Sequence, residues 1–172
     1  MNGFGKAKKG QAAIEYLMTY GWALLVIAIV IVALYVIMQN QVRSEKCIAS
    51  TGFTCDVPQV YVDSSGNAFM SVRFYNDQLQ GITVKKVLCT TTPSSQVDPK
   101  LVDPLAPVQE IPNGFSGNFT MACKNGANPL KFAAGQQFNG YLVVWYNYDN
   151  DPNPNVFRMT EASASTTIVK ST

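Results

Sequence analysis

The first part of the chain is an unbroken apolar stretch that predicts a long helix. The run from Tyr16 to Met38 contains 23 residues and no charge, and about 20 apolar residues are enough to cross a bilayer as an α-helix. Its Ala, Leu and Met residues favour helix, and its Val and Ile residues are tolerated where the surroundings are apolar. We therefore predict one hydrophobic helix over residues 11–46, ending in the polar sequence QNQVRSEK.

From Val57 onward the pattern changes to the period-two alternation of β-strands. Met70, Val72 and Phe74 alternate with the residues between them, after the turn sequence DSSGN. At Lys85-Lys86 the alternation slips by one position, which predicts a β-bulge. A strand is expected to begin at residue 82, and further strands are predicted at 115–123, 138–149 and 156–169.

The spacing of these strands predicts the class of the second domain. The segment 93–112 contains five prolines and is expected to be poor sheet material, because proline cannot donate to a sheet ladder. Six or seven short strands in the remaining sequence predict an antiparallel, immunoglobulin-like β-sandwich over 47–172. The expected fold class is α+β.

Charge and histidine content exclude several classes of function. The formal net charge of +2 comes from three lysines among the first ten residues, and the rest of the chain has ten basic and eleven acidic residues. We therefore expect no basic face for nucleic acid. The chain has no histidine, which excludes Ser-His-Asp and Cys-His nucleophile systems and most catalytic zinc sites. We expect no enzyme activity, no cofactor and no metal.

The same charges predict how the chain is oriented at a membrane. Lys6, Lys8 and Lys9 precede the apolar run, so the positive-inside rule predicts a cytoplasmic N-terminus and an exported C-terminal domain. A secretory signal peptide has an apolar core of only about 7–15 residues and a small-residue cleavage site. The residues after Met38 are Gln-Asn-Gln-Val, so we expect the helix to stay on the protein.

Four cysteines lie in the part of the chain that is expected to be exported. Export favours disulfides, and the sequence has no Cys-x-x-Cys pair of the zinc-ribbon kind. Three pairings are possible. The favoured one joins Cys47 to Cys55, closing a short loop at the end of the helix, and joins Cys89 to Cys123, linking two strands. Four reduced cysteines in the core are the alternative.

The sequence Lys8-Lys9-Gly10-Gln11, followed by Glu15 and the apolar helix, resembles the class III signal peptide of archaeal type IV pilin-like proteins. In that family a prepilin peptidase cuts after the glycine, so the resemblance implies removal of a leader, residues 1–10. Gln11 then becomes the first residue and Glu15 the fifth, which matches the family pattern in the sequence QAAIE.

The resemblance also implies a function and a set of partners. The implied function is that of a subunit of an adhesive cell-surface filament, in which the helices polymerise in the core and the β heads form the outer sheath. The implied partners are further copies of the chain, a prepilin peptidase, an assembly ATPase with its membrane platform, and the membrane that stores the precursor. An archaellum-type filament subunit shares this plan, and a single-pass anchored adhesion or sugar-binding module that does not polymerise uses the same helix.

Glu15 is the residue that separates a filament subunit from an anchored protein that does not polymerise. A carboxylate beside an apolar run is costly, by about 2.5–3.5 kcal/mol at a membrane centre and less near its edge. After cleavage, Gln11 carries a new α-amino group one helical turn from Glu15. We expect the amine of an incoming subunit to meet Glu15 of a subunit already placed, which fixes the axial register. A pair within one chain is the alternative.

Two further signals lie in the exported part. Asn118-Phe119-Thr120 is an N-glycosylation sequon, and its alternative is an unmodified strand residue. The sequence from Asp149 to Asn155 has the oxygen spacing of the first half of a calcium loop, but a proline stands where such loops need glycine. We expect a polar hairpin loop there, without a metal.

Overall fold

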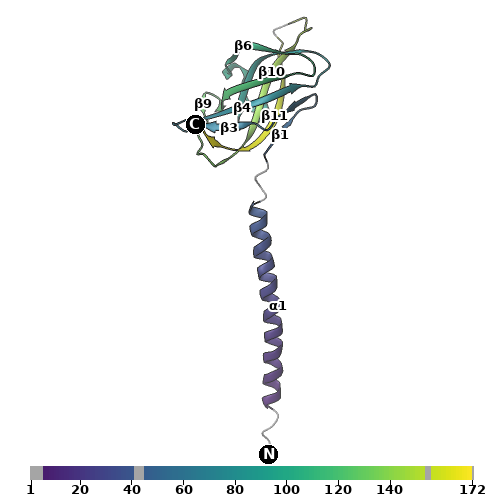
Figure 1. Ribbon diagram of the computed structural model, residues 1–172, viewed down its shortest axis with the longest axis vertical. Helices are drawn as coiled ribbons and strands as arrows, with labels where there is room; N and C mark the ends of the chain where they lie inside the picture. The colour runs from purple at the N-terminus through teal and green to yellow at the C-terminus, as the bar shows by residue number, and fades with distance from the viewer. Residues whose placement is uncertain (1–5, 41–44, 154–155, 172) are drawn as a thin grey trace, which may run out of the picture. The chain divides into compact units, whose positions relative to one another are not determined.

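The computed structural model describes residues 6–40, 45–153 and 156–171. The chain divides into two compact units, Met1–Val42 and Arg43–Thr172. The first contains the helix α1, and the second, called the head below, contains all the strands of the described residues (Figure 1). The α+β class and the mainly antiparallel sheets follow the sequence-based prediction.

Helix α1 (Lys6–Asn40) has 35 residues, and its stretch Ile14–Met38 is long and apolar enough to cross a membrane. The helix begins earlier than expected, because the Lys, Ala and Gln residues around the glycine are good helix formers. It also ends earlier: Glu45 is not helical, and Lys46 lies in a strand opposite Ser165. Strand pairing therefore takes up Lys46, which was expected to be the last residue of the helix. Residues 41–44 lie outside the described residues.

One sheet of the head has five antiparallel strands. In spatial order they are β1 (Lys46–Ala49), β11 (Arg158–Thr167), β10 (Gln137–Tyr148), β5 (Ile82–Thr90) and β6 (Pro104–Ile111). The two longest strands, β10 and β11, form a hairpin whose loop contains the polar Asp149–Asp151 segment. The loop and the strands at 138–149 and 156–169 thus agree with the prediction within two residues, except that a short strand begins separately at Val169.

The second sheet is built around β4 (Ala68–Asn76). Strands β2 (Phe53–Cys55) and β3 (Gln59–Val62) pair with one edge of β4, and β7 (Ser116–Ala122) pairs with the other. The short strand β12 (Val169–Lys170) runs parallel to β3. A small hairpin, β8 (Lys124–Asn125) with β9 (Asn128–Pro129), follows β7.

The inner faces of the two sheets share one hydrophobic core. The alternating residues Met70, Val72 and Phe74 of β4 are 0–4% exposed, and they belong to the same buried cluster as Leu142 and Val144 of β10. Side-chain alternation in a strand places one set inward and the next outward. The period-two pattern of the sequence is therefore the pattern of this core.

Two features of the first sheet show what proline and bulges do to strand pairing. The pairing of β10 with β5 skips Lys85, so the β-bulge predicted there is confirmed. The expectation that 93–112 is poor sheet material is wrong for residues 104–111, because they form β6, which carries Pro104 and Pro107. Strand β6 is the edge of its sheet, where a missing amide donor faces outward and breaks no ladder bond. The helical turns η1 (Ser94–Gln96) and η2 (Pro99–Leu101) occupy the rest of that segment.

Both disulfides have the favoured pairing. Cys47 of β1 is bonded to Cys55 of β2, and Cys89 of β5 is bonded to Cys123, which directly follows β7. Each bond therefore joins one sheet to the other. From the sequence, this bond was expected at the end of the helix. Cys47 lies instead in a strand of the head, so its bond fastens the two sheets together.

Candidate functional site

The surface of α1 is the largest apolar feature of the described residues. Every described side chain from Ile14 to Met38 is exposed, and the large apolar ones range from 38% exposed at Val26 to 76% at Met18. A helix that is apolar on all sides is stable only inside a membrane or among other apolar helices. The backbone hydrogen bonds of a helix are internal, so α1 can lie in either environment without leaving polar groups unpaired.

The residues of the predicted cleavage site lie within this helix. Gly10 and Gln11 both have helical backbone, and residues 1–5 of the predicted leader lie outside the described residues. A peptidase that binds its substrate in extended form has to unwind the helix at this point. Glycine costs about 1 kcal/mol relative to alanine in a helix interior, so Gly10 lowers the cost of unwinding the helix at this point.

Glu15 stands four residues after Gln11, on the same side of α1 and at the edge of the apolar stretch. Its side chain is exposed. The rings of Tyr16 and Tyr20 stack on each other at 5.4 Å between centroids, one turn further along. Tyrosine is favoured at the boundary between water and hydrocarbon. The carboxylate and these rings are consistent with a boundary at this end of the span.

The sequon residue Asn118 lies on the outer face of the second sheet. Its side chain is exposed, and its Oδ1 accepts a hydrogen bond of 3.1 Å from Nε of Arg73. Arg73 also faces Asp56, with 4.0 Å between Nη1 and Oδ2, and Tyr75 donates to the same carboxylate. The hydrogen bond with Tyr75 and the carboxylate of Asp56 raise the pKa of Arg73. The amide nitrogen of Asn118 lies on the surface, where a glycan can be attached.

The polar loop after β10 uses its carboxylates within the head. Asp151 accepts from the backbone amide of Tyr148 and pairs with Arg158, which lowers the pKa of Asp151. Asp149 accepts from the hydroxyl of Thr83 at 3.0 Å. Among the described residues no group of three His, Cys, Asp or Glu side chains is arranged to hold a metal. The arrangement is that of a braced hairpin loop.

Sequence reasoning did not find the apolar side chains that the head exposes on its loops. Leu79 is 93% exposed and Phe115 is 64% exposed. Both stand between turn residues, in the sequences DQLQG and NGFSG, where a large apolar side chain has no strand or helix face to join. That local contrast is the signal that identifies them from sequence.

No protein-family model matches this chain, and no curated protein matches its sequence. Function is therefore argued from the residues and their arrangement.

Proposed function

We propose that the chain is a pilin-like structural subunit of an archaeal type IV pilus-like surface filament. The observation that carries the proposal is the surface of α1: a stretch of 25 residues, Ile14–Met38, apolar on every side and with a single carboxylate, Glu15, at its start. Before assembly the helix spans the cytoplasmic membrane, with its N-terminus in the cytoplasm. In the filament, neighbouring helices take the place of lipid.

The position of Glu15 favours a filament over a permanent membrane anchor. A membrane anchor does not require a carboxylate at the edge of its apolar stretch. In a filament the α-amino group of Gln11 of one subunit can pair with Glu15 of another, and opposite charges that are removed from water together partly cancel their desolvation costs. The sequence from Lys8 to Glu15 resembles class III signal peptides. This resemblance implies that a prepilin peptidase cuts before Gln11 and so creates the amine.

The head is the exported part in this proposal. Its two disulfides support a location on an oxidising side of the membrane. Two facing antiparallel sheets with a shared core support its assignment as an immunoglobulin-like sandwich that forms the outer sheath. An adhesive role and a glycan on Asn118 belong to the same proposal.

The processing step is tested with two variants at Gly10. N-terminal sequencing of the mature wild-type protein, with electron microscopy of sheared surface material, is expected to show filaments whose subunits begin at Gln11. Gly10→Val is expected to leave uncut precursor in the membrane, because a β-branched side chain cannot enter a narrow extended site as glycine does. Gly10→Ala is the milder control. Membrane-bound protein that begins at Met1 in the wild type would favour the anchored module instead.

The assembly step is tested at Glu15. Glu15→Ala and the isosteric Glu15→Gln are expected to be exported and cleaved normally and to form few or no filaments, since both remove the charge. Glu15→Asp, with its shorter reach, is expected to be intermediate. The measurement compares cleaved membrane protein with sheared filaments for each variant. A normal filament yield from Glu15→Gln would show that the charge has no part in assembly.

A further inference from the structure

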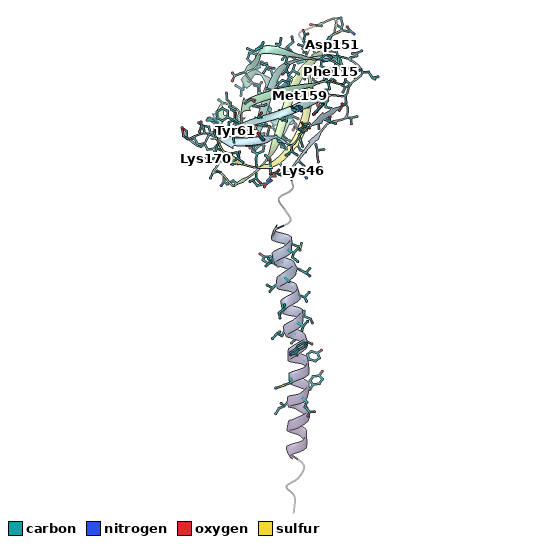
Figure 2. All side chains as sticks on the ribbon, in the orientation of Figure 1. Lys46, Tyr61, Phe115, Asp151, Met159 and Lys170 are labelled. Atoms are coloured by element: carbon teal, nitrogen blue, oxygen red, sulfur yellow. A yellow bond between two sulfur atoms is a disulfide. The ribbon has the colours of Figure 1, made fainter. Side chains whose placement is uncertain are left out.

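Two loop tips at one end of the head each present a large apolar side chain to solvent. Leu79 lies in the loop between β4 and β5, and Phe115 lies in the turn between β6 and β7. The third loop at this end is the one after β10, because its Asp149 bonds Thr83 near the start of β5. Figure 2 shows Phe115 and Asp151 together at this end, which we call the tip, and Tyr61 and Lys170 at the other.

A fully buried asparagine holds the two tip loops in place. Asn76 is 0% exposed. Its Nδ2 donates to the carbonyl oxygens of Gln80 at 2.8 Å and Ile111 at 3.0 Å, and its Oδ1 accepts from the amide of Gln78 at 3.1 Å. Buried polar groups that are fully hydrogen-bonded specify one conformation of the segments they join. The side chain of Asn76 thus connects the β4–β5 loop to the end of β6.

The backbone of Asn76 fixes the second tip as well. Its carbonyl accepts from the amide of Gly114 at 2.8 Å, and its amide donates to the carbonyl of Phe115 at 2.9 Å. The β4–β5 loop has a further brace, since the hydroxyl of Tyr148 donates to Oε1 of Gln78 at 3.3 Å. Exposed side chains on a pre-organised loop lose little conformational entropy on binding, so the tip has the properties of a binding surface.

A pocket of mixed polarity lies toward the opposite end of the same strands, and its lining includes the ion pair of Lys124 with Asp103. It is lined by Leu88 of β5, by the residues from Leu101 to Leu105, and by Met121 near the end of β7. Strand β7 runs from the tip to this pocket, and the six residue-to-residue steps from Phe115 to Met121 span about 20 Å at the rise of an extended strand. One head therefore carries an apolar projection and a partly apolar recess on different ends of one molecule.

The charges of the two ends are of opposite sign. The segments of the tip carry four carboxylates, those of Asp77, Glu110, Asp149 and Asp151, against the single guanidinium of Arg158. The segments that line the pocket or adjoin it carry four lysines against two aspartates: Lys85, Lys86, Lys100 and Lys124, with Asp98 and Asp103. Two tips repel each other, and so do two pocket ends. A tip and a pocket end attract each other.

We propose that the tip of one head, with Leu79 as its central side chain, docks into the pocket beside Leu101 on the head of a second copy. A projection that fits a recess elsewhere on the same molecule forms a head-to-tail contact, and such contacts propagate as open chains unless the rotation closes a ring. The inference rests on the proposed function in one respect: it assigns a contact between heads to the polymer that the helices build. The acidic tip disfavours anionic lipid as the occupant.

The test uses two full-length variants, Leu79→Cys and Leu101→Cys. Both wild-type side chains are exposed, at 93% and 57%, so neither change removes a core contact. The two variants are co-expressed, the surface material is oxidised mildly, and linked peptides are mapped without reduction. We expect a 79–101 disulfide between chains. The pair Leu79→Cys with Val169→Cys, whose leucine and valine are also exposed, is the matched control and is expected to give none.

Filament yield gives a second measurement. Leu79→Ser is expected to lower the yield of sheared filaments about tenfold, which is the usual scale for truncating a central interface residue. Val169→Ser removes another exposed apolar group from a different surface and is expected to leave the yield unchanged. Both variants are expected to melt at the wild-type temperature.

The outcomes separate this inference from the proposed function. Filaments that form normally without a 79–101 link would overturn the inference and leave the filament intact. A 79–101 link in membranes of cells that make no filaments would support the head contact and count against the filament. A 79–79 link would show a symmetric tip-to-tip contact and overturn the inference.

A lipid-bound tip gives a different result with the same variant. The thiol that Leu79→Cys introduces is treated with a water-soluble thiol reagent in the presence of phosphatidylglycerol vesicles. We expect the vesicles to leave its labelling rate unchanged. Protection by the vesicles, without links between chains, would assign the tip to lipid and overturn the inference as well.

Discussion

The helix and the head use the same apolar residue types in opposite ways. Ile29 and Val30 of α1 are 59% and 50% exposed, whereas Ile82 and Val60 of the head are both 0% exposed. The head closes two sheets over the apolar side chains of its core and needs nothing else to bury them. The helix has no second layer of its own, and a domain needs two packed layers to form a core. In the proposed function its burial comes first from lipid and then from other copies.

The helix and the head also differ in where their backbone hydrogen bonds are made. All backbone bonds of a helix lie within one segment, so α1 can move between lipid and protein without losing any of them. The sheets of the head have edges, including the proline-bearing β6, whose free groups need water or a partner. The helix is therefore suited to exchanging environments, and the head to remaining in one.

The largest expected effect comes from truncating a large side chain in the core of the head. Phe74 is fully buried and stacks on Phe53 at 5.1 Å, so Phe74→Ala is expected to lower the free energy of unfolding of the head by about 3–5 kcal/mol. Leu25→Ala, in the exposed helix, is expected to leave the melting of the head unchanged. Thermal unfolding of the full chain in detergent, followed by near-ultraviolet circular dichroism, measures both. Equal destabilisation by the two changes would show that the units do not fold independently.

The next effect compares the two disulfides. Cys89–Cys123 closes a separation of 34 residues and Cys47–Cys55 one of 8. In the chain-entropy model the longer loop contributes about 1.3 kcal/mol more to stability, through greater restriction of the unfolded chain. The double change Cys89→Ala/Cys123→Ala is therefore expected to lower the melting temperature more than Cys47→Ala/Cys55→Ala. The reverse order, with both proteins folded, would mean that native contacts around the short bridge outweigh loop entropy.

The smallest expected effect is a fall in the stability of the head at alkaline pH. Burial, together with the neighbouring Tyr148, raises the pKa of Tyr146 to about 12. Between the unfolded pKa of about 10 and this value, the folded state holds a proton that the unfolded state has lost, so stability falls as pH rises. The melting temperature of the wild type is expected to fall by about 2–4 °C more than that of Tyr146→Phe between pH 9 and 11. Parallel curves for the two proteins would rule out Tyr146 as the source.

Most of the local elements could be predicted from the sequence, for a physical reason. The apolar run to Met38 and the alternation through Met70 and Phe74 are properties of neighbouring residues, and periodicity along the chain reports which faces are buried. The slip at Lys85 is visible in the same way. The C-terminal end of α1 was misjudged because Lys46 pairs with Ser165, a residue far away in the sequence.

The residues of the candidate site also differ in whether local sequence is enough to identify them. Gly10, Gln11 and Glu15 are identified by the resemblance of their sequence to class III signal peptides, which needs no tertiary contact. The sequence favoured Cys89–Cys123 among several pairings, and the packing of the two sheets brings those residues together. The strand β6 was missed because tolerance of proline depends on whether a strand is at an edge, which is a property of the whole sheet.

The sequence by itself determined that this protein has an apolar helix with one acid at its start, followed by a β-rich domain that carries all four cysteines. These are sums over neighbouring residues, and short-range periodicity and charge order are sufficient to state them. Only the tertiary structure decided which strands are neighbours, that Asn76 is buried where it can hold two loops, and that Leu79 and the pocket beside Leu101 lie on different ends of the head. Those facts depend on pairings between segments that are distant in the sequence. The free energy of such pairings is shared among many contacts, so no single position in the chain reveals it.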